Sequence, residues 1–160
     1  MKTIILDFNK PIKNIEIKED TEILGLFMGS QNFDCKNSFE IIHKRPFLTS
    51  RILIKAVLTD ESSFQIEPKL RIEMGAKRCD SYLKIAVLLI SNDAKAQAIP
   101  SLEILEQDVK AGHAATIGKL DAEQMYYLQM HGFTKKDAEK LLIKAFTADI
   151  ISKIAISKNK

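Results

Sequence analysis

Five side chains of this sequence carry a thiol or an imidazole, the groups most suited to binding a transition metal. Among them, His113 is the histidine nearest the point where the sequence pattern changes from strands to helices. A neutral imidazole is a plausible metal ligand, and the alternative is a structural histidine at this junction. Cys79, in the run Arg78-Cys-Asp-Ser81, is either a sulfur ligand or a buried thiol that behaves as a small hydrophobic residue.

The other thiol and imidazoles have simpler interpretations. Cys35 lies in a polar segment, so an exposed and reactive thiol is expected there, although nothing pairs with it. The two cysteines form no C-x-x-C motif and are expected to be thiols rather than a disulfide. We expect His131 to act as a cation near the last carbonyl groups of a helix. His43, close to Pro46, is expected to be structural.

The sequence has no motif of a nucleotide-dependent or hydrolytic enzyme. It contains no phosphate-binding loop, no G-x-S-x-G and no His-Glu-x-x-His, so we expect neither an ATP site nor a catalytic centre in this chain. The net charge of +3, without a basic cluster that includes aromatic residues, argues against nucleic acid as a partner. No apolar run is long enough to span a bilayer, and Asp7 comes too early for a signal peptide. A cytoplasmic protein without membrane contact is expected.

Most of the sequence consists of short segments with the alternation typical of strands. A length of 160 residues with 46% hydrophobic residues indicates one domain, or one domain with a small appendage. Many short strands without a helix between them exclude a doubly wound α/β fold and leave a sandwich, a barrel or a β-solenoid. No exact repeat length is visible, and the low glycine count (6) argues mildly against a regular solenoid. The expected strands are Thr3–Phe8, Asn14–Lys18, Glu22–Met28, Phe39–His43, Arg51–Leu58, Phe64–Glu67, Leu70–Met74 (separated from the previous one by Pro68), Tyr82–Ile90, Leu102–Ile104 and Val109–Ala111.

Helical spacing begins at Asp121, which can cap a helix that Gly132 ends. Thr134 caps a second helix, and Thr147 is expected to cap a third. We therefore divide the chain into a β core (1–120) and a C-terminal segment of two to three helices (121–160). The helices either pack on each other and on the last strands, or use one apolar stripe to bind a partner.

The run Ile85–Ile90 is apolar at every position, so both faces of its strand are apolar. The second face must be covered by the C-terminal helices or by another copy of the protein, because an open one would favour aggregation. We expect a homodimer.

A series of short blocks at fixed spacing resembles the C-terminal core of the SufB/SufD family, the non-ATPase part of the Suf iron–sulfur cluster assembly scaffold. The resemblance is specific from Ser81 to Phe146 and weaker back to about His43. Its blocks are Pro100-Ser-Leu-Glu-Ile, Asp108-Val-Lys-Ala, His113-Ala-Ala-Thr and Leu120-Asp-Ala-Glu-Gln-Met-Tyr-Tyr-Leu.

The resemblance implies a right-handed parallel β-helix, here an irregular solenoid, followed by a small helical segment. It implies a homodimer through the β-helix and a SufC-like ABC ATPase bound to the C-terminal helices. It further implies a transient iron–sulfur cluster at the dimer interface, where His113 matches a histidine of the family. His113 and Cys79 are then the expected iron ligands.

Two departures from the family pattern leave alternatives open. The scaffold cysteine would fall near Ile85 rather than at Cys79, and Ala114 replaces a glutamate, which makes the chain more SufD-like. The leading function is a non-enzymatic scaffold component, and the alternative is an adaptor that binds the ATPase without carrying a cluster. A β-solenoid enzyme acting on polysaccharides would need converging carboxylates, and Glu73, Asp80 and Glu103 are scattered.

Overall fold

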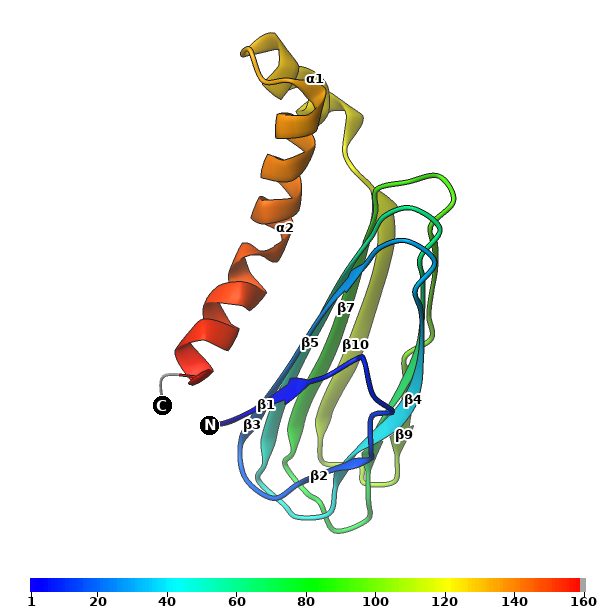
Figure 1. The fold of residues 1–160 in the computed structure, drawn as a ribbon. Coiled ribbons are helices and arrows are strands. Elements are labelled where there is room, and N and C mark those ends of the chain that lie inside the picture. The colour runs from blue at the N-terminus through cyan, green and yellow to red at the C-terminus, as the bar shows by residue number, and fades with distance from the viewer. Residues whose placement is uncertain (159–160) are drawn as a thin grey trace.

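A computed structural model describes residues 1–158 as ten strands followed by two helices (Figure 1). The strands are β1 (Lys2–Leu6), β2 (Ile15–Ile17), β3 (Thr21–Gly29), β4 (Asp34–His43), β5 (Thr49–Leu58), β6 (Ser63–Ile72), β7 (Asp80–Leu89), β8 (Lys95–Ala98), β9 (Ser101–Ile104) and β10 (Lys110–Lys119). The helices are α1 (Ala122–Met130) and α2 (Lys135–Lys158).

The strands form two parallel sheets that face each other. Sheet A has the order β1-β3-β5-β7-β10, and sheet B has the order β2-β4-β6-β8, with β9 also pairing with β6. The chain alternates between the two sheets and advances by one strand per turn, which is the path of a β-solenoid. The predicted fold class, a β-solenoid followed by C-terminal helices, is confirmed.

The turns of the solenoid repeat with slightly different lengths. In sheet A, Ile23 pairs with Ile52, Ile52 with Leu83 and Leu83 with His113, which are steps of 29, 31 and 30 residues. Only the apolar character of this inward row is kept from β3 to β7, and His113 departs from it on β10. A search for an exact repeat fails because neither length nor residue identity is constant.

Left-handed residues close equivalent corners of successive turns. At one corner Gln31 and Asp60 have φ values of 56° and 55°, and at the other Phe47 and Arg78 have 63° and 55°. Such values usually favour glycine, because a Cβ atom crowds the following carbonyl group. The solenoid therefore forms with few glycines. Their low number, which the sequence analysis took as an argument against a regular solenoid, does not prevent this fold.

Pro68 was predicted to separate two strands. It lies instead inside the single strand β6. The carbonyl groups of Ser62, Ile66 and Ile72 accept bonds from the strands on the β8–β9 side, so the even-numbered residues of β6 direct their backbone there. Pro68 therefore points its nitrogen to the gap between β8 and β9, where Pro100 interrupts the pairing. A missing N–H group costs little at a position without a ladder bond.

The first turn of the solenoid is closed by an aromatic plug. Phe8, in the loop after β1, is buried and packs edge-on against Phe27 and Phe64, with ring centroids 6.1 and 5.4 Å apart. Gly25 on β3 leaves the room for this ring, because a Cβ atom there would lie 2.8 Å from two Phe8 carbons.

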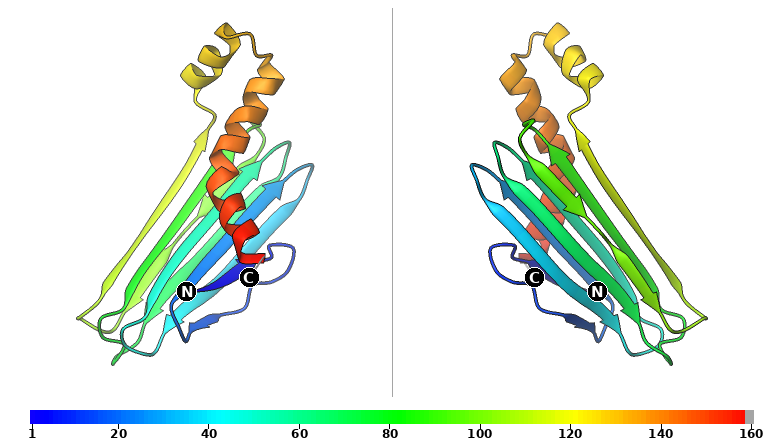
Figure 2. Two further views of the ribbon diagram at one scale, coloured as in Figure 1. Left: turned by 90° about the vertical axis from the view of Figure 1, so that its left-hand side faces the viewer. Right: turned by 90° about the vertical axis from the view of Figure 1, so that its right-hand side faces the viewer.

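The helices lie outside the solenoid. Figures 1 and 2 show α1 beyond the ends of the strands and α2 running back across the outer face of sheet A, where it contacts β3 and β5. Asp121 caps α1, and Thr134 begins α2 by bonding to Asp137, as predicted. Thr147 does not cap a third helix. It lies inside α2, and its hydroxyl donates to the Ile143 carbonyl four residues earlier.

Two of the three outer-facing side chains of the run Ile85–Ile90 are buried within this single chain, and the third, Ile90, is half-buried. Ala86 and Leu88 are 7% and 8% exposed, on the sheet face that α2 crosses. The chain itself covers this face, so the run no longer argues for a dimer. The homodimer stays a prediction that must rest on another surface.

Candidate functional site

The open end of the solenoid is formed by β10. This strand pairs with β7 on one side, and within residues 1–158 its other side carries no strand. The Lys110 N–H donates to the Cys79 carbonyl, so even-numbered residues of β10 direct their backbone to β7. By alternation, odd-numbered residues, including His113, direct theirs to the open edge.

The sequence placed His113 at a strand-to-helix junction, but it lies in the middle of β10. It belongs to the inward row and stands beside the fully buried Leu83, yet its own side chain is exposed. The nearest strands of sheet B, β8 and β9, are short and contact β10 without covering this side chain. Exposed apolar side chains surround this end of the interior, namely Leu102, Ile104 and Ile117. His113 is thus an exposed imidazole at an apolar opening.

Cys79 is a buried thiol. It is 1% exposed and packs with Ile72 and Ala76, and its S–H donates to the Arg45 carbonyl at 3.1 Å. Burial raises the pKa of the Cys79 thiol above its ordinary value. In this conformation the thiolate, which is the metal-binding form, is disfavoured.

The structure does not bring His113 and Cys79 together within one chain. His113 pairs with Leu83, four residues after Cys79 along β7. At about 3.3 Å per residue and about 4.8 Å between strands, their Cα atoms are about 14 Å apart. Among residues 1–158, no group of three or more His, Cys, Asp or Glu side chains could hold a metal ion. A shared ligand role requires a contribution from another chain, and it stays a prediction.

Cys35 was predicted to be exposed in a polar segment. It points inward from β4 instead and is 3% exposed. Burial raises the pKa of its thiol. Both cysteines are free, which confirms that they form no disulfide. The expected contact of His131 is present, because its Nδ1 lies 2.8 Å from the Tyr127 carbonyl at the end of α1.

His43 is fully buried and has the structural surroundings that were expected. Its Nε2 lies 2.8 Å from the Ser50 hydroxyl, which in turn contacts the Ser81 hydroxyl. Within the described part of the chain, its Nδ1 has no hydrogen-bond partner. Burial lowers the pKa of His43 to about 4, so the imidazole is neutral at physiological pH.

The three carboxylates considered for a polysaccharide-active enzyme do not converge. Each is engaged by a basic residue of its own neighbourhood: Glu73 by Arg71, Asp80 by Arg51, and Glu103 by Lys69. Asp80 begins β7 in sheet A, whereas Glu103 lies on β9 in sheet B. This geometry offers no pair of carboxylates for acid–base catalysis.

A second surface lies at the helical tip. An apolar groove of about 550 Å³ separates α1 from α2, with Tyr127 and Leu128 on one wall and Leu141, Leu142 and Ala145 on the other. Large exposed side chains flank it: Tyr126, Met130 and Phe133. The sequence analysis identified the apolar stripe of α2 but not the wall that α1 contributes. The reason is that the pattern of a single helix does not indicate which other helix packs beside it.

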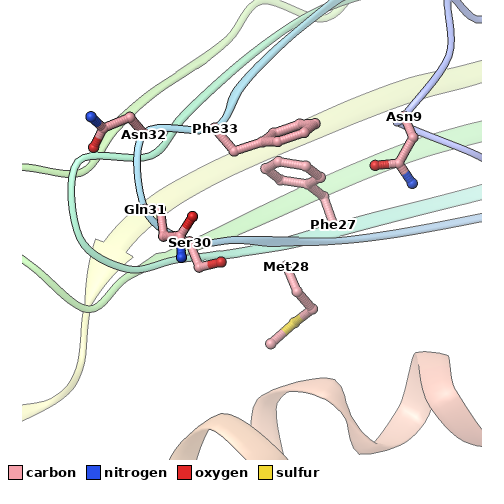
Figure 3. Close-up of a pocket in the computed structure, with 7 residues that line it drawn as sticks. All are labelled: Asn9, Phe27, Met28, Ser30, Gln31, Asn32 and Phe33. Atoms are coloured by element: carbon pink, nitrogen blue, oxygen red, sulfur yellow. The ribbon is translucent and has the colours of Figure 1, made fainter.

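A further cleft lies at the corner between β3 and β4, where Phe27 faces Phe33 with ring centroids 5.7 Å apart (Figure 3). Its lining consists of uncharged residues without a thiol or an imidazole: Asn9, Phe27, Met28, Ser30, Gln31, Asn32 and Phe33. It contains none of the predicted site residues.

The fold, the open β10 edge and the groove between α1 and α2 define a class of protein. A parallel β-solenoid with an open terminal edge, carrying exposed apolar helices, has surfaces of the kind that bind other chains. Among residues 1–158, no helix is long and apolar enough to cross a membrane.

Comparison with known proteins identifies the family. The family model "SUF system FeS cluster assembly, SufBD core domain" matches residues 12–146. The chain is 35% identical over 136 residues to the iron-sulfur cluster assembly protein SufD of Bacillus subtilis (85% of this chain, 30% of that protein). It is 31% identical over 128 residues to SufD of Escherichia coli (80% and 30%), and 30% identical over 145 residues to a SufBD family protein of Mycobacterium leprae (86% and 37%). The chain belongs to the SufBD family. It spans about a third of the length of these relatives.

Proposed function

We propose that this chain is a non-enzymatic component of an iron–sulfur cluster assembly scaffold that pairs through its β-solenoid and binds an ABC-type ATPase through its C-terminal helices. The observation that carries the proposal is the match of residues 12–146 to the SufBD core domain. The relatives from Bacillus subtilis and Escherichia coli are both iron-sulfur cluster assembly proteins. The cluster is cargo that the scaffold assembles and hands on. A cytoplasmic location, expected from the sequence, is part of the proposal.

The open edge of β10 supports pairing of two copies. Its odd-numbered residues leave N–H and C=O groups that a second β10, running antiparallel, would satisfy. To keep both interiors continuous, inward residues must face inward residues, so odd-numbered positions must lie opposite odd-numbered ones. Of the two registers that keep this rule and use most of the strand, one places His113 opposite Ala115 of the second copy. The other places His113 opposite Ile117.

The first register brings the two His113 side chains close together. They become diagonal neighbours across the pair of strands, about 7–8 Å apart at Cα, within reach of one bound metal or cluster. Both imidazoles would lie on the inward face, among the apolar residues of the two open ends. Cys79 stays on the far side of Val109. The two paired chains therefore supply two imidazoles without rearrangement, whereas their two thiolates become available only after a rearrangement. We propose His113 as the primary contact to the cluster and Cys79 as a ligand that must first be uncovered.

The groove between α1 and α2 supports the ATPase contact. Exposed apolar surface of this extent at the tip of two helices is typical of a protein–protein interface. The groove lies beyond the ends of the strands, so a bound partner would not block the β10 edge (Figure 1). Both contacts can therefore be made at once.

Co-purification of the full chain with a SufC-like ABC ATPase tests the proposal. Leu141→Asp places a charge in the groove and should weaken retention of the ATPase by tenfold or more. Met74→Asp is the matched control, because Met74 is an exposed apolar residue at a corner far from the helices and should have no effect. If the intact chain retains no ATPase, the partner claim fails. If Leu141→Asp binds like the control, the groove is the wrong surface.

The burial of Cys79 favours one alternative, an adaptor that binds the ATPase without carrying a cluster. Such an adaptor would keep the fold, the edge and the groove, while its thiols serve only as small core residues. Iron binding separates the two functions, as argued in the Discussion.

A further inference from the structure

The outer face of sheet A carries a lysine that is almost completely buried. Lys55 on β5 lies between Leu26 of β3 and Ala86 of β7 in the same row. Its side chain is only 11% exposed, because α2 covers it. A buried ammonium group loses its hydration, and this loss must be offset by the groups it contacts.

Within residues 1–158, the hydrogen-bond and ring contacts of the Lys55 ammonium group come from one turn of α2. Nζ donates to the Asp149 carboxylate at 2.7 Å and to the Phe146 carbonyl at 2.6 Å, and it lies 4.7 Å from the centre of the Phe146 ring. The Ile150 N–H donates to the Asp149 carboxylate, so this carboxylate is fixed on the helix. A second pair, Lys153 with Glu22 of β3, lies nearer the C-terminus.

The α2 contact also has an apolar part, because Leu24, Val57, Ala86 and Leu88 on the outer face of sheet A are at most 8% exposed. Of the 24 residues of α2, three are buried: Ala138, Thr147 and Ile150. The Lys55 ammonium group and its partners on α2 thus lie within a contact that is otherwise mainly apolar. Polar contacts of this kind lose little free energy when they separate, because water replaces the partner on each side.

We propose that α2 is a reversible strap over the outer face of sheet A, and that Lys55 is the latch that lowers the free-energy cost of its release. When the strap lifts, Lys55 and Asp149 become hydrated, whereas an apolar residue in place of Lys55 would resist exposure. Release uncovers the apolar outer face of β3, β5 and β7, including Leu24 and Leu88. It also lets α1 and α2 turn about the connection between β10 and α1 while the solenoid stays intact. This inference rests on contacts within one chain and does not depend on the proposed function.

Hydrogen exchange of the full chain, followed by mass spectrometry, tests the strap. Asp149→Asn leaves the ammonium group without a compensating charge and should speed exchange of the amides in 146–158 about tenfold. Lys55→Met keeps the length and removes the charge, and it should leave exchange there unchanged or slow it. Lys84→Met is the matched control, because Lys84 is an exposed lysine of the same sheet face without a contact to Asp149.

The outcomes are distinct. If Lys55→Met speeds exchange in α2 as Asp149→Asn does, the lysine is a net stabiliser and the proposal is wrong. It is equally wrong if neither variant changes exchange in 146–158. Exchange in β3, β5 and β7 reports whether the solenoid itself has been destabilised. If Lys55→Met destabilises it, Lys55→Leu replaces that variant and the same outcomes apply.

Discussion

The thiol of Cys79 lies directly beneath the corner formed by residues 45–48, where its S–H donates to the Arg45 carbonyl at 3.1 Å. This contact and the raised pKa of the thiol make Cys79 chemically protected in the folded chain. We expect a maleimide to modify Cys79 at least 100-fold more slowly in the native protein than in denaturant. Mass spectrometry of alkylated peptides measures both rates.

Cys35 serves as an internal reference for this experiment, because it is a second buried thiol with a raised pKa. If both cysteines react slowly, the folded chain protects them alike. Native modification of Cys79 at the rate of a free thiol, with Cys35 still protected, would show that the corner at residues 45–48 opens. Such opening would favour the role of Cys79 as a ligand.

The substitution Gly25→Ala is expected to destabilise the chain by about 1–3 kcal/mol, the usual effect of overpacking a core. The new Cβ would lie 2.8 Å from the Phe8 ring, which is itself packed between other aromatic rings. Gly118→Ala is the control, since no atom lies within 4 Å of the Cβ position there. Urea denaturation gives both free energies of unfolding. Equal effects of the two substitutions would mean that Phe8 does not close the solenoid.

The buried His43 should make stability depend on pH. Its folded pKa of about 4 is below its unfolded value of about 6.5, so the unfolded chain binds the proton first. Its contribution is therefore fully present above the unfolded pKa and is lost as the pH falls from about 6.5 to about 4. The full loss is about 3 kcal/mol at about 1.4 kcal/mol per pKa unit.

Urea denaturation between pH 7 and pH 4.5 measures this loss. His43→Gln should remove most of the slope, while His131→Gln should keep it, because His131 is exposed at the end of α1. An unchanged slope in His43→Gln would assign the acid sensitivity to other groups.

Several features of the fold follow from local pattern, and others depend on distant partners. The caps Asp121 and Thr134 were predictable, because a capping side chain bonds within its own helix turn. Cys35 was misjudged, because its neighbours Asp34 and Lys36 are polar. In β4 these two point outward while the thiol points inward, and strand alternation in a short window looks like a polar loop.

The site was only partly predictable for the same reason. His113 was identified as a candidate ligand, but β10 was predicted to end at Ala111, since the following small residues carry no clear alternation. The exposure of His113 depends on where sheet B stops, and no residue near His113 encodes that. The latch between Lys55 and Asp149 joins residues 94 positions apart, and only the folded chain shows it.

Pairing through β10 can be tested by a proline on the open edge. Ala115 directs its N–H away from β7, so Ala115→Pro should leave the monomer folded and abolish the dimer. Ala114→Pro removes a ladder bond to β7 and should instead lower the thermal stability. Analytical ultracentrifugation and thermal unfolding separate the two effects. A dimer that survives Ala115→Pro would place the interface elsewhere.

Iron binding decides between the scaffold and the adaptor. Anaerobic reconstitution of the scaffold with iron and sulfide should give a brown protein with sulfur-to-iron absorption, from the cluster sulfide and from any thiolate ligand. His113→Ala should weaken the colour because it removes the imidazole at the open edge, and Ala115→Pro should do so by separating the two His113 side chains. Cys79→Ser should weaken it too if the thiol is uncovered during assembly, whereas Cys35→Ser should leave it unchanged.

Each result has one interpretation. A wild-type chain that stays colourless supports the adaptor. Full retention of iron in both Cys79→Ser and His113→Ala would show that the named site is wrong, because the iron would then be bound elsewhere. Loss of iron in His113→Ala with full retention in Cys79→Ser would keep the edge site and exclude the thiol from it. That last pattern is the one the static geometry favours, because His113 is exposed at the opening and Cys79 is sealed about 14 Å away.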